Sequence, residues 1–143
     1  MRGGYDYTPI PLSEASCIIA HLFVELALPC SCCNREDNDE IVIQGTAYDG
    51  TGAKIIIKGK EVRYYGKQRT LAAIRAGQCR PPALRSALRN CRKLIDNIEF
   101  AHENLPGVTD DAFAFWSRLA AGVKNQTAAW YKKDRERAAK LVT

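Results

Sequence analysis

The feature that constrains the fold most is a pair of strand-like runs joined by a strong turn. Ile41–Tyr48 and Lys54–Lys58 are rich in β-branched residues, and Asp49-Gly50-Thr51-Gly52 between them is typical of a hairpin turn. Gly59-Lys60 can turn the chain again into a third run, Glu61–Tyr65. The pattern predicts a small antiparallel meander of two or three strands.

The second run contains three consecutive isoleucines, Ile55, Ile56 and Ile57. Without alternation, a strand presents apolar side chains on both of its faces. We therefore expect this strand to be the central one and to be covered on both faces.

The most apolar run of the chain is predicted to form a buried helix over about 14–28. Its large apolar residues recur at helical spacing, Ser13 can cap its start, and Pro29 can end it. Residues 1–12 contain two glycines and two prolines and are expected to form an extended arm. Acidic residues within and before the run, and the lack of a small-residue cleavage site, argue against a signal peptide. We therefore expect a cytoplasmic protein whose cysteines are thiols or metal ligands.

Helical periodicity dominates after residue 66. A short helix is predicted from Thr70 to about Ala76, and a longer one from the Pro81-Pro82 pair to about Asn104. A further helix begins at Thr109 and is expected to break near Gly122 and Asn125, before a terminal helix over about 127–141. The long helix carries one apolar stripe, made of Leu84, Leu88, Cys91, Leu94, Ile95, Ile98 and Ala101.

The same region has the cadence of a helix-turn-helix motif, with Asn90-Cys91 as the turn. The apolar stripe runs through Cys91 without a change of phase, so one continuous helix explains more residues. The whole chain is then predicted to be a single α+β domain over 1–143. It comprises the arm, a helix with a small antiparallel β-meander over 13–66, and a helical C-terminal half over 67–143.

Charge is segregated along the chain. Residues 53–93 contain twelve Lys or Arg and one acid, whereas residues 1–52 contain eight acids and two cations. The last fifty residues carry equal numbers of each sign, so the net charge of +5 conceals a central block of +11. Such a block repels itself unless anions lie nearby, so the cations are expected to converge into one surface patch that attracts a polyanion.

Nucleic acid is the polyanion that we expect. Lys and Arg neutralise phosphates, an exposed aromatic ring can stack on an unpaired base, and residues 66–70 offer free backbone N–H groups at a helix start. The residues predicted to bind it are Lys54, Lys58, Lys60, Arg63, Tyr64, Tyr65, Lys67, Arg69, Arg80, Arg85, Arg89, Arg92 and Lys93. The two tyrosines should point to opposite sheet faces, so at most one can stack. The alternative explanation is a solvated charged surface on which the acidic N-terminal third docks.

The cysteines and histidines form only a weak metal pattern. Zinc takes Cys and His ligands, and the candidates are Cys17, His21, Cys30, Cys32 and Cys33. Paired CxxC spacing is absent, and Cys17 and His21 can equally be core residues, so no metal and no cofactor are predicted. Cys17, His21 and Glu25 also imitate a nucleophilic triad, but three groups stacked on one helix do not allow the geometry that such catalysis needs.

The glycine-rich segments 45–54 and 66–68 lack the residues of a phosphate loop. We therefore predict a non-enzymatic regulatory protein that binds nucleic acid or a ribonucleoprotein. A small basic protein of this kind suits a virus- or phage-encoded inhibitor of a host nucleic-acid machine, although no residue indicates this source. The alternative is a protein–protein module that binds an acidic protein and forms homo-oligomers through its C-terminal helices. No membrane association is expected.

Overall fold

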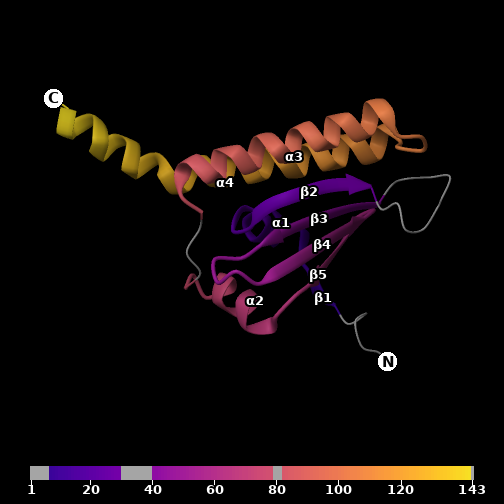
Figure 1. The fold of residues 1–143 in the computed structure, drawn as a ribbon, viewed down its shortest axis with the longest axis horizontal. Coiled ribbons are helices and arrows are strands. Elements are labelled where there is room, and N and C mark those ends of the chain that lie inside the picture. The colour runs from indigo at the N-terminus through magenta and orange to yellow at the C-terminus, as the bar shows by residue number, and fades with distance from the viewer. Residues whose placement is uncertain (1–6, 30–39, 79–81, 143) are drawn as a thin grey trace.

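The computed structural model describes residues 7–29, 40–78 and 82–142 (Figure 1). Five strands and four helices lie within these residues. In chain order they are β1 (Thr8–Ile10), α1 (Leu12–Ala20), β2 (Phe23–Pro29), β3 (Glu40–Thr46), β4 (Gly52–Lys58), β5 (Glu61–Tyr65), α2 (Gln68–Arg75), α3 (Leu84–Asn104) and α4 (Asp110–Val142). The predicted α+β class is confirmed, including the helical C-terminal half.

The strands form one antiparallel sheet in the order β1-β5-β4-β3-β2. The three predicted strands are confirmed as β3, β4 and β5. The predicted turn between the first two is also present. In it, Asp49 Oδ1 accepts hydrogen bonds from the Thr51 amide at 3.0 Å and the Thr51 hydroxyl at 2.6 Å. Gly50 has a φ of +83°, which favours glycine. β4 is the central strand, as predicted.

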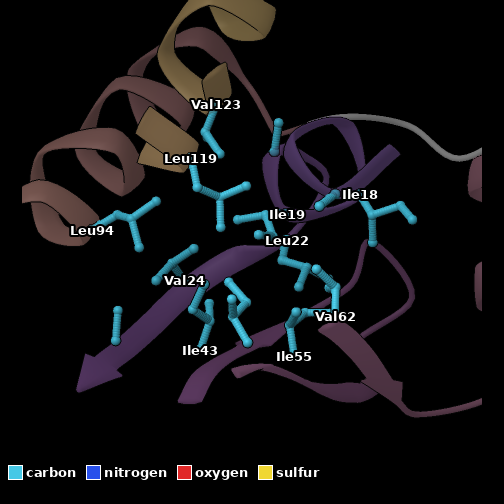
Figure 2. Close-up of a cluster of buried hydrophobic side chains, with 14 of the residues drawn as sticks. Ile18, Ile19, Leu22, Val24, Ile43, Ile55, Val62, Leu94, Leu119 and Val123 are labelled. Carbon is cyan, nitrogen blue, oxygen red and sulfur yellow. The ribbon is translucent and has the colours of Figure 1, made fainter. Parts of the chain in front are cut away.

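Within the described residues, helices cover one face of the sheet and leave the other uncovered. Ile55 and Ile57 of β4 are buried in the core, whereas Ile56 lies on the other face and is half-buried. The expectation that both faces are covered is therefore wrong. Figure 2 shows the reason, since core residues of α1, α3 and α4 all meet the same face of the strands. The labelled core residues are Ile18, Ile19, Leu22, Val24, Ile43, Ile55, Val62, Leu94, Leu119 and Val123.

The predicted helix over 14–28 is wrong in its second half. The apolar run divides into α1, which ends at Ala20, and β2, which begins at Phe23. A run that is apolar on all sides fits a buried helix or a buried strand equally well, so periodicity alone could not find the boundary. The start also differs, because Pro11 occupies the N-cap position and Ser13 lies inside the helix.

β2 pairs with β3 through an irregular register. The pairing shifts between Val24 and Leu26, so Glu25 is the extra residue of a β-bulge. β1 forms the opposite edge of the sheet by pairing with β5, Thr8 opposite Tyr64. Part of the predicted extended arm is therefore an edge strand.

The helical half follows the prediction at most boundaries. α2 is followed by Gly77 with a φ of +72°, α3 is continuous through Asn90 and Cys91, and the Thr109 hydroxyl caps α4 by accepting the Ala112 amide at 3.1 Å. The continuous α3 excludes the helix-turn-helix alternative. In the apolar stripe of α3, Leu88 is exposed and Ala87 takes the buried place.

The predicted break in the last helix is wrong, because α4 runs without interruption from Asp110 to Val142. Gly122 lies where α4 crosses α1, and a Cβ there would be 2.4 Å from Ser16 Oγ. Close packing between helices explains this glycine better than a break does. In Figure 1, α3 and α4 run side by side, and the C-terminal end of α4 continues past the end of α3. Within the described residues, no helix is both long and apolar enough to cross a bilayer.

Candidate nucleic-acid interface

The structure separates the predicted binding residues into distinct groups. Lys54, Lys58, Arg63 and Tyr65 lie on the uncovered face of the sheet, and Arg85, Arg89, Arg92 and Lys93 are exposed on α3. Lys67 and Arg69 lie at the start of α2, and Lys60 lies in the β4–β5 turn. Tyr64 is buried in the core, and Arg80 lies outside the described residues.

We name the uncovered face the open sheet face. Cross-strand register places its side chains in two main rows, Tyr65–Lys54–Gln44–Leu26 and Arg63–Ile56–Val42–Leu28. The first row is polar or charged up to Gln44 and ends at Leu26, whereas the second row is charged only at Arg63 and is apolar from Ile56 to Leu28. Leu26 is 40% exposed and Phe23, on the same face, is 36% exposed. Apolar side chains on an uncovered sheet face are typical of a surface that contacts a ligand or partner.

The β5 side of the open sheet face holds two neighbouring tyrosines, with their rings tilted against each other and cations against them. The rings of Tyr7 and Tyr65 have centroids 5.6 Å apart. Lys54 Nζ lies 5.4 Å from the centre of the Tyr65 ring, and Arg63 Cζ lies 4.7 Å from the centre of the Tyr7 ring. Arg63 is held in place by Glu61, with Nη2 2.6 Å from Oε1, and this hydrogen bonding raises the pKa of Arg63 above its ordinary value.

One cation of the open sheet face has acidic residues beside it. Lys58 lies in register between Glu40 on β3 and Glu61 on β5. The excess of positive charge therefore lies toward the other end of the strands, at Lys54. The start of α2 approaches the same end of the sheet, since Gln68 Nε2 donates to Thr8 Oγ1 at 2.7 Å. This end gains the neighbouring exposed cations Lys67 and Arg69.

The second group is the α3 cation stripe, made of Arg85, Arg89, Arg92 and Lys93. All four side chains are exposed, and among the described residues no carboxylate lies within ion-pair distance of any of them. The acids of the same helix follow in its second half, at Asp96, Glu99 and Glu103. Arg85 lies in the first turn, at the positive end of the helix dipole, and no acid offsets it there.

The α3 cation stripe and the open sheet face point to different sides of the molecule. Ala87, Cys91, Leu94 and Ile98 of α3 are buried in the core between the helices and the covered face of the sheet. The stripe lies on the opposite side of the helix and therefore points away from the sheet. The sequence predicts that the cations converge into a single patch. In the structure they instead form two separate surfaces.

Only one of the two predicted tyrosines can contact a ligand. Tyr64 is 1% exposed, and its hydroxyl donates to the Lys67 carbonyl at 3.1 Å. It is a core residue, so its predicted role in binding is wrong. Tyr7 takes the second aromatic place on the open sheet face. Sequence reasoning missed Tyr7 because the pairing of β1 with β5 joins segments that are distant in sequence.

Lys60 belongs to neither surface. It lines a cavity of about 360 Å³ between the β4–β5 turn and the first turns of α4, together with Asp111, Phe115 and Arg118. One acid and two cations border this cavity, and no described carboxylate forms an ion pair with Lys60. Lys60 therefore lies apart from the residues with which it was predicted to act.

The Cys17–His21–Glu25 column does not exist, because α1 ends before His21 and Glu25 belongs to β2. His21 Nδ1–H donates to the Cys17 carbonyl at 2.8 Å, and the imidazole edge packs on Trp130 with ring centroids 4.5 Å apart. Burial, with a smaller contribution from Glu14, raises the pKa of the Cys17 thiol, which makes it a weak nucleophile. His21 is thus a buried structural residue, and Cys17 beside it is half-buried.

Stability is expected to fall in mild acid because of His21. This side chain is 6% exposed, and burial lowers its pKa below the ordinary 6.5, despite the opposing effect of its bond to the Cys17 carbonyl. The unfolded chain therefore binds a proton at a pH where the folded chain does not. The contribution of His21 to the free energy of unfolding is fully present above pH 6.5 and is lost as the pH falls below this value. Thermal unfolding between pH 7.5 and 5 measures it.

His21→Gln should flatten this part of the pH profile. His102→Gln is the matched variant, since it removes the second histidine, which stacks on Phe113 outside this site. A His21→Gln profile that runs parallel to that of the wild type throughout this range would contradict the assignment.

Of the zinc candidates, the structure describes only Cys17 and His21. Within the described ranges, no three His, Cys, Asp or Glu side chains are grouped so that they could hold a metal ion. Cys30, Cys32 and Cys33 lie outside these ranges. Cys17 and Cys91 form no disulfide with another described residue.

Comparison with known proteins gives no relative. No protein-family model, no curated protein and no solved structure matches the chain.

Proposed function

We propose that the protein is a non-enzymatic regulator that binds nucleic acid, alone or within a nucleoprotein complex. The observation that carries the proposal is the α3 cation stripe. Its four cations are exposed and have no described carboxylate within ion-pair distance, and Arg85 lies in the first turn, where the helix dipole disfavours positive charge. A phosphate backbone supplies the missing anions.

The arrangement of the stripe has a cost in the free protein. Arg85, Arg89 and Lys93 follow at four-residue spacing, so neighbouring like charges lie on the same helix face. Each such pair destabilises a helix by about 0.2–0.5 kcal/mol. An acid at position 85, in the first turn, would also suit the helix dipole better than Arg85 does. A binding role explains why cations occupy these exposed positions.

The surroundings of Cys17 and His21 support a binding protein over an enzyme. Cys17 has a raised pKa and His21 is buried against Trp130. Neither residue is therefore an activated nucleophile beside an accessible base, which is the arrangement that covalent catalysis needs. Binding without chemistry requires no such arrangement.

Charge reversal on α3 tests the proposal. The variant with Arg85, Arg89 and Arg92 changed to Glu should bind labelled DNA and RNA roughly a hundredfold more weakly at 0.1 M salt, because three phosphate contacts become repulsive. The slope of log affinity against log salt concentration should also fall by about 2–3. Fluorescence anisotropy at several salt concentrations measures both quantities.

The matched control reverses three exposed cations of α4, Arg118, Lys124 and Lys132, to Glu. It changes the net charge equally and should weaken binding far less. Equal losses in the two variants would show that only total charge matters. Absence of binding by the wild type at low salt would contradict the proposal and favour the protein–protein alternative, with an acidic protein as partner.

A further inference from the structure

We propose that the open sheet face binds the unpaired bases of single-stranded nucleic acid, with Tyr7 and Tyr65 as the stacking rings. This inference rests on the proposed function and adds to it the strandedness of the ligand and a second contact surface. The first argument is that the face is uncovered. The buried residues of all four helices belong to the core on the other side of the sheet, so no described helix packs on this face.

The second argument is the chemistry of the exposed rings. Tyr7 is 39% exposed and Tyr65 is half-buried beside it, with the two ring planes tilted by 42°. Two rings in this arrangement offer separate faces for neighbouring bases. Aromatic rings on an exposed sheet are a recurrent platform for the unstacked bases of a single strand.

The third argument is that the rings are held in place before a ligand arrives. Arg63 lies over Tyr7, is held by Glu61 and also donates a hydrogen bond to the Tyr65 hydroxyl. Arg63 is therefore a positioning residue for both rings. Less side-chain entropy is then lost on binding, which favours affinity.

The fourth argument concerns the path of the backbone. Lys54 lies against Tyr65 and in register with Gln44, so a base on Tyr65 has an ammonium group and an amide beside it. Lys67 and Arg69 lie at the same end of the sheet, near Thr8. Phosphates beside the stacked bases would meet Lys54 on the open sheet face, whereas Lys67 and Arg69 lie around the end of the sheet, because the contacts of α2 to Thr8 and Tyr64 are on the covered side. Ile56 and Val42 continue the face with apolar contacts for a base edge.

The same features argue against the other polyanions. A duplex hides the faces of its bases, so it could use the cations but not the rings. An acidic protein segment could use the cations but would gain little from the two tyrosine rings. A ligand that carries both flat rings and negative charges fits all of these residues.

The test compares single strands with duplexes. Fluorescein-labelled ten-nucleotide DNA and RNA, each as a single strand and as a duplex, are titrated against the full chain by anisotropy. Single strands of both kinds should bind the wild type more tightly than duplexes do. Tyr65→Ile should weaken single-strand binding roughly ten- to hundredfold, since base stacking is lost, and should leave duplex binding unchanged. Tyr65→Phe keeps the ring and should retain the affinity to within about threefold.

Tyr48→Ile is the matched control, because Tyr48 is 48% exposed but follows β3 outside the sheet. It should bind as the wild type does, and circular dichroism confirms that each variant is folded. Equal affinity for single strands and duplexes, with no effect of Tyr65→Ile, would overturn the inference and leave the proposed function standing if α3 reversal still weakens binding. Equal competition by polyglutamate would also overturn it, in favour of an acidic protein. No binding of any nucleic acid would overturn both.

Discussion

Replacement of Trp116 by alanine is expected to destabilise the fold by about 3–5 kcal/mol, the range for loss of a large buried aromatic side chain. Trp116 is 1% exposed, and it begins the buried face of α4 that Leu119 and Val123 continue. That face packs on α1, so a void at Trp116 would loosen the layer that covers the sheet. Urea unfolding followed by circular dichroism measures the change in unfolding free energy.

Phe100→Ala is the matched control, because Phe100 is 53% exposed on α3. Its loss should change stability by no more than about 0.5 kcal/mol. If Trp116→Ala unfolds completely at room temperature, Trp116→Phe should still fold with an intermediate loss. A Trp116→Ala midpoint equal to that of the wild type would contradict the position of α4 on α1.

Replacement of Gly45 by alanine should cost about 2–3 kcal/mol, although it adds a single methyl group. Gly45 is buried in β3, where a Cβ would lie 2.7 Å from the Phe23 carbonyl oxygen and 3.2 Å from Leu22 Cβ. The first obstacle is backbone, so no change of rotamer can relieve it. The β2–β3 pair would have to separate or shift. Thermal unfolding should show a midpoint lower by about 5–15 °C.

Gly52→Ala provides the comparison within the same sheet. Gly52 begins β4, and no atom lies within 4 Å of the position of its added Cβ. This variant should keep or slightly raise the midpoint, since alanine restricts the unfolded chain. Equal midpoints for the two variants would be incompatible with the close approach of β2 to Gly45.

Local signals in the sequence were sufficient for the elements that local chemistry determines. Turn residues located the hairpin between β3 and β4, and Gly77 and Thr109 marked the end of α2 and the start of α4. The same reasoning failed where tertiary packing decides. Phe23 is apolar in an apolar run, and only pairing with β3 makes its segment a strand. Gly122 resembles a helix breaker until its contact with Ser16 is known.

The candidate site was predictable in composition but not in geometry. The block of cations was visible in the sequence, and the opposite orientation of Tyr64 and Tyr65 followed from strand alternation. The division of the cations into the open sheet face and the α3 cation stripe depends on which side of the sheet the helices cover. Tyr7 joins the site only because β1 returns to pair with β5.

The bulge at Glu25 has a consequence for how copies of the chain meet in concentrated solution. β2 is an apolar strand at an edge of the sheet, and a regular edge of this kind templates the addition of strands from other molecules. The extra residue interrupts the regular spacing of hydrogen-bonding groups and places a carboxylate within the edge. Growth into fibrils along β2 is thereby disfavoured, even though the segment from Phe23 to Leu28 is apolar enough to support it.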